Sequence, residues 1–490
     1  MISPDARHRY DDSPVVGIGA STSGAAVPPE WRAYFLALLH DQPRFVARRR
    51  YLRKDIAGVM RRLIPDDARV LEVGVGAGHV LAALPNDVRH GVDVLAEAVD
   101  AARRLDPAMR VELADVVTFH SPTRYDAIVC DRLLHSVADA QRMLDNMVAH
   151  LEEDGRIYLT CFNFLWGLPL GIATRLGLIE RSPPENWFSE STLNNLFVLS
   201  GLEPVYFEDR VLVPFDVPAL NSFAAQIPPF RFGSLYRTYV LRRRRVRREA
   251  NPTVSVIVPA RNEEKNIAGA IARTPPMGAK TEIVFVEGGS TDGTWAEIQR
   301  MIETYRGPLT LRAFRQTGKG KGDAVRLGFE KATGSMLMIL DADLTVPPEE
   351  LPKFYDAMAS GLTDYVHGTR MVYPMEDEAM RFLNKAGNAF FARTFSFLLG
   401  QALKDTLCGT KVIWKHDYER LAKRRAYFGE LDPFGDFDLI FGARKLNLKI
   451  MEIPIRYKSR VYGETNISRF RDGALLLRMT ALAARKIKFA

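Results

Sequence analysis

Two series of alternating strand-length and helix-length segments constrain the fold of this chain more than any other feature. In the first series, five apolar stretches of strand character are separated by helix-length stretches of mixed polarity. They read RVLEV, HGVDV, RVELAD, YDAIVCD and RIYLTCF, beginning at residues 69, 90, 110, 125 and 156. The second series begins with TVSVIVPA at residue 253 and ends with LKIMEIPIRYK at residue 458, without repeating the first. Each series is typical of βαβ units around a mostly parallel sheet.

The length and composition agree with a two-domain α/β protein. A chain of 490 residues exceeds the size at which one hydrophobic core keeps growing. The apolar fraction of 47% and the charged fraction of 26% exclude a largely disordered or membrane-embedded chain. We expect a disordered tail (1–30), a doubly wound domain with a helical N-terminal cap at 31–65 (31–214), a basic linker (215–251), a second α/β domain (252–470) and a basic amphipathic helix (471–490).

The cysteines and the apolar runs bear on the cellular compartment. Cys130, Cys161 and Cys408 lie far apart, without the paired spacing of a disulfide framework or a zinc site. The longest apolar stretch, residues 164–179, contains a proline and an arginine, and is shorter than the roughly 18 residues of a spanning helix. We therefore expect a cytoplasmic protein without a transmembrane helix.

A glycine-rich segment in the first series has the features of a ligand-binding loop. VLEVGVGAGHV places Glu72 and three glycines between a strand and a helix, where the bare backbone lets a ligand approach closely. The glycines are Gly74, Gly76 and Gly78. Asp93 ends the next strand, where a carboxylate can accept both hydroxyls of a ribose, and Asp115 ends the strand after it. Three consecutive strand ends thus carry candidate binding residues.

These residues resemble the first motif of the class I S-adenosylmethionine-dependent methyltransferases, acidic-x-Gly-x-Gly-x-Gly, over about residues 66 to 160. The resemblance implies a Rossmann-like methyltransferase fold with S-adenosylmethionine as cofactor. It assigns the methionine end to Glu72 and the glycines, the ribose to Asp93 and the adenine amino group to Asp115. The alternative is a nicotinamide-binding domain, whose Gly-x-Gly-x-x-Gly has its third glycine one residue later.

The methyl-transfer site is expected beside CDRLLHSV, residues 130–137, with His135 as a candidate base. The alternative interpretation of His135 is a histidine hydrogen-bonded to the backbone at a helix start. Methyl transfer depends mainly on in-line positioning, so a strong base is not required. The acceptor is expected near residues 163–187, whose tryptophans and prolines indicate a lid, a lipid-facing flap or plain core packing.

In the second series, an apolar strand runs directly into Asp341 and Asp343. Two carboxylates at i and i+2 can share one divalent cation, Mg²⁺ or Mn²⁺, which would bridge a diphosphate and neutralise the leaving group. The alternative is a solvated acidic turn. Three further segments favour the metal interpretation: VIVPARNEE and VFVEGGSTDGT, which are strand-to-loop transitions, and the loop TGKGKGDAVRLG. Together they predict a nucleotide-sugar site.

This half resembles the family 2 glycosyltransferases of GT-A fold, especially dolichyl-phosphate mannosyltransferase-like enzymes, over nearly all of residues 253–470. The resemblance implies an inverting transfer from a nucleotide-diphosphate sugar. It assigns the base and ribose to Pro259, Ala260, Glu263 and Glu287, the nucleotide to Lys321, the ribose and metal to Asp341 and Asp343, and the phosphates to Arg370 and Arg460. The sequence departs from the family at Glu287-Gly288, where Asp-Asp is usual, and at Asn466, where a lysine is often found.

The identity of the sugar acceptor determines whether a base is needed. A hydroxyl must lose a proton during the displacement, whereas a lipid phosphate is already an anion. Asp436 and Asp438 stand at an expected helix start, and one of them is the candidate general base. The alternative for Asp436 is an N-cap.

The chain end carries a basic amphipathic pattern. Arg471, Arg478 and Arg485 recur every seven residues, on a face different from that of the apolar side chains. The apolar positions are Leu475, Leu476, Met479, Leu482, Ala483 and Ile487. Such a helix can lie on an anionic membrane, here the inner face of the cytoplasmic membrane, or it can dock on the second domain with a solvated basic face. The arginine-rich stretch 237–248 is a second candidate contact, and no motif accompanies it that favours nucleic acid.

The sequence therefore predicts a bifunctional transferase. One half would glycosylate a lipid-phosphate, lipid-linked or cell-envelope glycan acceptor, and the other would methylate a related molecule. The alternative is a glycosyltransferase for a soluble hydroxyl acceptor, with the methyltransferase-like half as a non-catalytic scaffold.

Overall fold

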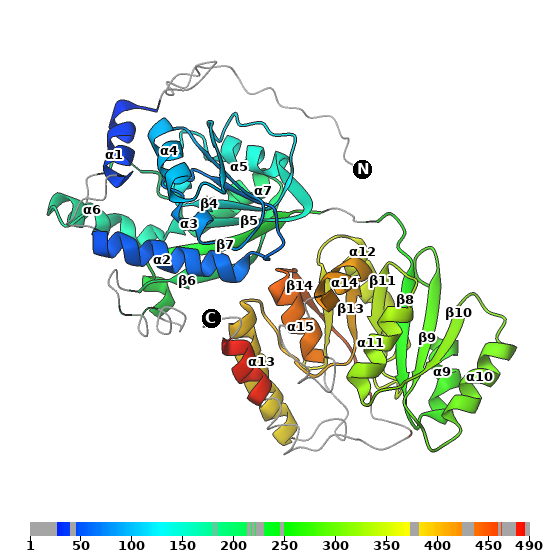
Figure 1. Cartoon of the computed structure of the whole chain (residues 1–490). Helices are drawn as coiled ribbons and strands as arrows, with labels where there is room; N and C mark the ends of the chain where they lie inside the picture. Colours follow the sequence, from blue (N-terminus) through cyan, green and yellow to red (C-terminus); the bar gives the residue numbers. More distant parts are fainter. Residues whose placement is uncertain are drawn as a thin grey trace, which may run out of the picture.

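The computed structural model consists of two α/β units, each built on a seven-stranded sheet (Figure 1). It describes residues 27–39, 46–179, 182–183, 185–212, 217, 221, 230–245, 249–372, 382–423, 436–458, 462 and 477–485. Residues 1–26, most of the expected tail, lie outside this description. Among the described helices, none combines the length and apolar character needed to cross a membrane.

The first sheet has the strand order β3-β2-β1-β4-β5-β7-β6. The five strands expected from the sequence are present and pair in parallel. The strands are β1 (Val70–Val73), β2 (Arg89–Asp93), β3 (Arg110–Leu113), β4 (Tyr125–Asp131), β5 (Leu151–Phe162), β6 (Leu202–Arg210) and β7 (Tyr236–Arg243). The helices after them are α3 (His79–Ala82), α4 (Ala96–Leu105), α5 (Ala140–Ala149), α6 (Gly167–Arg175) and α7 (Glu190–Leu199), with short turns η1 (Leu133–His135), η2 (Phe164–Trp166) and η4 (Phe230–Gly233). The expected α/β fold of this half is confirmed.

Strand β7 corrects the predicted domain boundary. It lies between β5 and β6 and pairs antiparallel with both, so the prediction of a linker at 215–251 is wrong for residues 236–243. Its arginines have partners: Arg237 binds Asp209, and Arg242 binds Glu203 at 2.8 Å. These charges are therefore not available to a membrane, and the first domain extends through β7.

The segment expected to cap the first domain contains two helices, α1 (Pro29–Leu39) and α2 (Val46–Leu63). Helix α2 buries Ile56, Met60 and Leu63 in the core formed with the sheet. None of the side chains of α1 is fully buried; an ion pair from Arg32 to Glu97 joins it to α4. Helix α1 therefore covers the domain without being part of its core.

The second sheet has the order β10-β9-β8-β11-β13-β12-β14. Its first and last strands, β8 and β14, match the first and last expected runs, whereas β13 was not expected and pairs antiparallel with β11 and β12. The strands are β8 (Val254–Ala260), β9 (Thr281–Glu287), β10 (Thr310–Arg315), β11 (Met336–Ile339), β12 (Tyr365–Thr369), β13 (Lys411–Trp414) and β14 (Ile450–Pro454). The helices are α9 (Glu264–Arg273), α10 (Thr294–Thr304), α11 (Lys321–Lys331), α12 (Leu351–Ala359), α13 (Phe382–Leu399), α14 (Lys415–Lys423) and α15 (Asp436–Lys445), with the turn η5 (Pro348–Glu350).

Part of the predicted C-terminal amphipathic helix is present, and it docks on the second domain. Met479 and Ala483 are buried in the same core as Phe395 and Leu399 of α13, while Arg478 and Arg485 are exposed. This arrangement corresponds to the docked alternative, because the apolar face of the described turns is already covered by protein. Leu475, Leu476, Ile487 and Arg471 lie outside the described residues.

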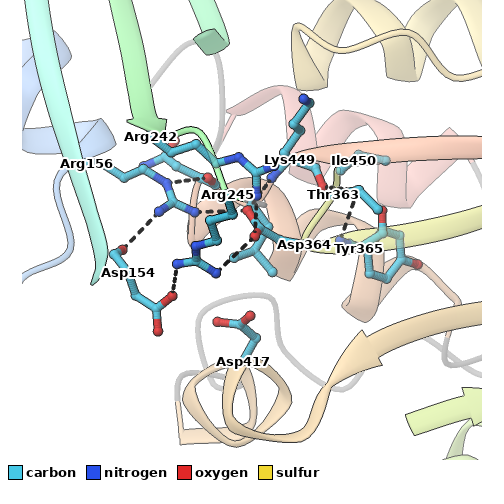
Figure 2. A network of polar contacts seen from close by, with 12 residues as sticks. Asp154, Arg156, Arg242, Arg245, Thr363, Asp364, Tyr365, Asp417, Lys449 and Ile450 are labelled. Atoms are coloured by element: carbon cyan, nitrogen blue, oxygen red, sulfur yellow. Dashed lines mark hydrogen bonds and ion pairs between the residues drawn. The ribbon is translucent and has the colours of Figure 1, made fainter. Parts of the chain in front are cut away.

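The two domains meet through a buried polar network centred on Asp364 (Figure 2). Its carboxylate accepts from Arg156 at 3.1 Å, from Arg242, and from the backbone N–H of Lys449 at 3.0 Å. Nη1 of Arg245 lies 3.6 Å from Oδ1 of Asp364. The arginines come from the first domain and Asp364 from the second, so this carboxylate compensates part of the positive charge that the first domain buries at the interface.

Asn447 closes the same interface. Its φ of 51° turns the chain between α15 and β14, and its amide donates to the carbonyl of Leu63 at 2.9 Å and to the hydroxyl of Tyr158 at 3.1 Å. The guanidinium of Arg444 lies 3.6 Å from the ring centroid of Tyr206. Specific buried contacts of this kind hold the domains in one relative orientation.

Candidate active sites

The glycine-rich loop connects β1 to α3 at the carboxyl end of the first sheet. Gly74, Gly76 and Gly78 all have positive φ, which side chains rarely adopt. A Cβ on Gly78 would lie 3.0 Å from Ala102, so this glycine allows helix packing, whereas a Cβ on Gly76 would meet no atom within 4 Å. Gly76 therefore leaves open space for a ligand.

Two carboxylates hold the loop in this shape. Asp93, at the end of β2, accepts from the N–H of Gly76 at 2.8 Å and of Leu95 at 3.0 Å, and burial raises its pKa above the ordinary value. Glu72 accepts from the N–H of Leu81 at 3.0 Å, and burial, together with the charge of Asp131, raises its pKa. Asp115 lies two residues after the end of β3 and accepts from the N–H of Val117 at 2.9 Å. The structure thus brings the three predicted acids and the glycines to one site.

A cavity of about 1690 Å³ opens at this loop. Glu72, Gly74, Gly76, Asp93 and Asp115 line one part of it. The remainder is lined by α1, α2, α6 and the segment that ends at Trp187. The 163–187 region therefore borders the same space as the candidate cofactor residues.

His135 lines the cavity but has both ring nitrogens engaged. Nδ1 lies 2.6 Å from the carbonyl of Asn186, and Nε2 accepts from the N–H of Phe162 at 2.9 Å. These partners fix the tautomer with the proton on Nδ1, and burial lowers the pKa of the ring. The ring presents no lone pair to a substrate, so the geometry corresponds to the backbone-bonded alternative and removes the reason for assigning His135 as base.

Two cavity residues were missed by the sequence analysis. Glu185 has its pKa raised by burial, which makes it a better candidate base than His135. Arg132 has a φ of 54°, unusual for a non-glycine residue, and its Nη2 is 2.8 Å from Asp131. The residue types in CDRLLHSV gave no signal for this backbone conformation.

In the second domain, Asp341 and Asp343 follow β11 directly, at the carboxyl ends of the parallel strands. Asp341 lies 2.6 Å from Lys321 Nζ at the start of α11. Burial alone would raise the pKa of Asp341, but the charge and hydrogen bond of Lys321 outweigh it and lower the pKa. Asp343 accepts from the N–H of Thr345 at 3.1 Å and from its hydroxyl at 2.8 Å. The three predicted residues are therefore brought together.

The predicted base and ribose residues lie on the neighbouring strand ends. Gly288 N–H donates to the carbonyl of Ala260 at 2.9 Å, which ties the end of β9 to that of β8. Glu263 and Glu287 are buried beside these ends; Glu263 accepts from Asn266 at 2.6 Å. Pro259 precedes Ala260 in β8. These positions share one edge of the sheet with Asp341.

Arg370 is engaged within the protein. Its Nε and Nη2 donate to the two carboxylate oxygens of Asp405 at 2.7 and 2.8 Å, and the ring centroid of Tyr457 lies 5.1 Å from its guanidinium carbon. Asp405 raises the pKa of Arg370 despite burial. Asp405 was not among the residues predicted from the sequence.

The remaining predicted residues are placed in part. Asp438 is buried on α15, 3.7 Å from Arg326. Asp436 begins α15, and its side chain lies outside the described atoms, as does all of Arg460. Within the described residues no cluster of three or more histidine, cysteine, aspartate or glutamate side chains could hold a metal. Two carboxylates nevertheless fit Mg²⁺, which commonly binds one or two carboxylates together with substrate phosphates.

Comparison with known proteins identifies both halves. Residues 255–427 match the family model for glycosyl transferase family 2, and residues 46–206 match that for a methyltransferase domain. The chain is 32% identical over 227 residues to a dolichyl-phosphate hexose transferase of Haloferax volcanii; this is 46% of the chain and 90% of that protein. It is 29% identical over 221 residues to a dolichol-phosphate mannosyltransferase of Pyrococcus furiosus, 44% of the chain and 59% of that protein's length.

Among solved structures, a methyltransferase of Thermotoga maritima, described as S-adenosylmethionine-dependent and possibly acting on histamine, is similar to the chain. The identity is 15% and the TM-score 0.35, with 43% of the chain and 98% of that protein covered.

Proposed function

Since the chain belongs to glycosyl transferase family 2 through its C-terminal half and carries a methyltransferase domain in its N-terminal half, we propose that it is a bifunctional enzyme with two separate active sites. The C-terminal site transfers a sugar from a nucleotide-diphosphate donor to a polyprenyl-phosphate-like acceptor. The N-terminal site methylates a related molecule with S-adenosylmethionine.

The observation that carries the sugar-transfer proposal is the grouping of Lys321, Asp341 and Asp343 at the carboxyl end of the second sheet. Asp341 and Asp343 would hold Mg²⁺ or Mn²⁺, which neutralises charge on the leaving diphosphate. Lys321 exchanges its ion pair with Asp341 for a phosphate oxygen when the donor binds. Glu263 and Glu287 line the base and ribose from the two neighbouring strand ends.

The lipid-phosphate acceptor is proposed from the names of the relatives, a dolichyl-phosphate hexose transferase and a dolichol-phosphate mannosyltransferase. A phosphate acceptor needs no general base because it is already an anion. With a hydroxyl acceptor, Asp436 or Asp438 would instead have to take the proton.

The methyltransferase proposal rests on the loop from Glu72 to Gly78 and on Asp93. The open side of Gly76 faces the space in which the cofactor would lie. Asp93 would accept from the ribose hydroxyls while it holds the loop through Gly76 N–H. Asp115 would receive the adenine amino group.

A reciprocal experiment tests both halves. Asp343→Asn should reduce sugar transfer roughly 100-fold or more, because charge stabilisation by a metal is worth several kcal/mol. Asp93→Ala should weaken S-adenosylmethionine binding by roughly 1.5–3 kcal/mol, because buried hydrogen bonds are lost. Each variant should leave the other activity intact, as measured by nucleotide release with Mg²⁺ or Mn²⁺ and by calorimetry.

The exposed Asp356 on α12 provides the matched control, Asp356→Asn. Equal activity of Asp343→Asn and Asp356→Asn would remove the metal assignment. Absence of cofactor binding in the wild type would identify the first domain as a scaffold. A screen of donors in the nucleotide-release assay would identify the sugar and the base.

A further inference from the structure

The cavity of the first domain is larger than one cofactor requires. Its volume of about 1690 Å³ exceeds the roughly 300–1,000 Å³ of an ordinary site for one small ligand. The proposed cofactor residues occupy only the part next to the glycine-rich loop. The remaining space is large enough for a second substrate.

The wall of this remaining space is apolar and aromatic. It is formed by side chains from α1, α2, α6 and the segment after α6. They include Trp31, Phe35, Leu38, Leu52, Leu170 and Trp187. A ligand that fills such a space gains free energy by burying apolar surface.

The helix that closes the cavity is apolar on its outer face as well. Five large apolar side chains between residues 164 and 176 are 48% to 77% exposed and do not line the cavity, a denser group than elsewhere in the described chain. They are Phe164, Leu165, Leu168, Ile172 and Leu176. A helix that is hydrophobic all round is normally covered on every side, and a contiguous exposed apolar patch marks a contact surface.

Exposed basic residues lie on two of the helices that line the cavity. Helix α2 lines the same cavity as α6 and lies next to it in Figure 1, and its Arg50 and Lys54 are exposed. Arg175 is exposed at the end of α6. Apolar side chains flanked by arginine and lysine are typical of a surface that rests in the head-group region of an anionic membrane.

We propose that the methyl acceptor is a lipid with a long apolar chain, which enters the cavity from an anionic membrane on which the outer face of η2 and α6 rests. This inference rests on the proposed methyltransferase function and names its substrate class. In the reaction, the acceptor atom supplies the electron pair of the new bond to the methyl carbon, and sulfur retains the pair of the broken bond. A proton on the acceptor passes to water or to Glu185.

Vesicle sedimentation of the full chain tests the membrane contact. The wild type should sediment with vesicles of phosphatidylcholine and phosphatidylglycerol, and much less with phosphatidylcholine alone. The double variant Leu168→Glu/Ile172→Glu should lose at least roughly tenfold in binding, because it places two negative charges on the contact face. Neither residue lines the cavity, so the affinity for S-adenosylmethionine should stay unchanged by calorimetry.

The matched control is Leu113→Glu/Leu199→Glu, at positions 59% and 65% exposed and outside this face. It adds the same charge and should sediment as the wild type does. Failure of the wild type to sediment, or equal loss in both double variants, would overturn the membrane contact. The membrane contact would also be overturned if the wild type self-associates and only the variant Leu168→Glu/Ile172→Glu abolishes this self-association. A second copy of the chain would then cover the exposed face of η2 and α6.

A second measurement tests the acceptor class. Label from S-adenosylmethionine carrying a tritiated methyl group should pass into the organic phase when the protein is incubated with a lipid extract, and the α6 variant should slow this transfer. Cofactor binding with label only in water-soluble products would refute the lipid acceptor but preserve the methyltransferase function. Sedimentation without cofactor binding would refute that function and the lipid methyl acceptor, and preserve only the membrane contact.

Discussion

Gly409 shows how closely the backbone approaches the proposed sugar-transfer residues. A Cβ at this position would lie 2.0 Å from Asp341 Oδ2 and 2.6 Å from Lys321 Nζ. Both distances are far below a van der Waals contact, so a side chain would displace the groups assigned to the metal and the nucleotide. The absence of a side chain at Gly409 is therefore part of the site.

We expect Gly409→Ala to reduce sugar transfer at least roughly tenfold, through a higher KM for the donor and a lower kcat, because the Lys321–Asp341 pair must shift. Cofactor binding in the first domain should not change. Gly58→Ala is the control, since a Cβ there would meet no atom within 4 Å and alanine favours the helix. Wild-type kinetics in Gly409→Ala would contradict this role.

At the scale of elements, the two antiparallel strands and the C-terminal helix decide how each sheet is completed. Strand β7 fills the position between β5 and β6, and β13 that between β11 and β12. The helical residues 477–483 cover the core beside α13 (Figure 1). Their apolar side chains stabilise the second domain, which leaves α6 as the element better suited to a membrane.

Met479→Ala should lower the free energy of unfolding by roughly 2–5 kcal/mol, because it removes a buried side chain and leaves a cavity. Leu477→Ala, two residues away at an exposed position, should cost less than about 0.5 kcal/mol. Urea denaturation followed by tryptophan fluorescence measures both. If Met479→Ala and Leu477→Ala both change the free energy of unfolding by the same small amount, the C-terminal helical residues do not dock on the second domain in solution.

At the scale of the whole molecule, Asp364 joins the domains. Arg156 and Arg242 are nearly inaccessible to solvent, and both donate to this one carboxylate. Burial lowers the pKa of Arg156, and the negative charge of Asp364 opposes this decrease. Buried charges of one sign need a compensating partner, so the relative orientation of the domains depends on this aspartate.

Asp364→Asn should destabilise the domain interface by roughly 3–5 kcal/mol, since it removes the counter-charge of buried Arg156 and one of the two carboxylates that bind Arg242. Calorimetry should then resolve two thermal transitions, one for each domain, where the wild type shows stronger coupling. The control Glu349→Gln breaks the exposed pair with Arg273 and should cost about 1 kcal/mol or less. An unchanged thermogram for Asp364→Asn would show that the interface does not couple the domains.

Local sequence patterns were sufficient to predict the parallel strands and most of the candidate residues. Each parallel strand is an apolar run followed by a loop, and such strands direct their carboxyl ends to one edge of a sheet. Glu72, Asp93 and Asp115 therefore meet at one site, as do Lys321, Asp341 and Asp343. Strand β7 escaped prediction because its arginines made it look like a linker, although Asp209, Glu203 and Asp364 compensate them.

The sequence by itself thus determined the two α/β domains, their families and the residues at the strand ends, because these follow from periodicity and short motifs. Only the tertiary structure determined the hydrogen-bond partners and the burial of side chains whose neighbours are distant in sequence. It engaged both nitrogens of His135, bound Arg370 to Asp405, and placed Met479 inside a core. The physical reason is that the burial and the hydrogen-bond partners of a side chain depend on segments that folding brings together, and no local pattern encodes them.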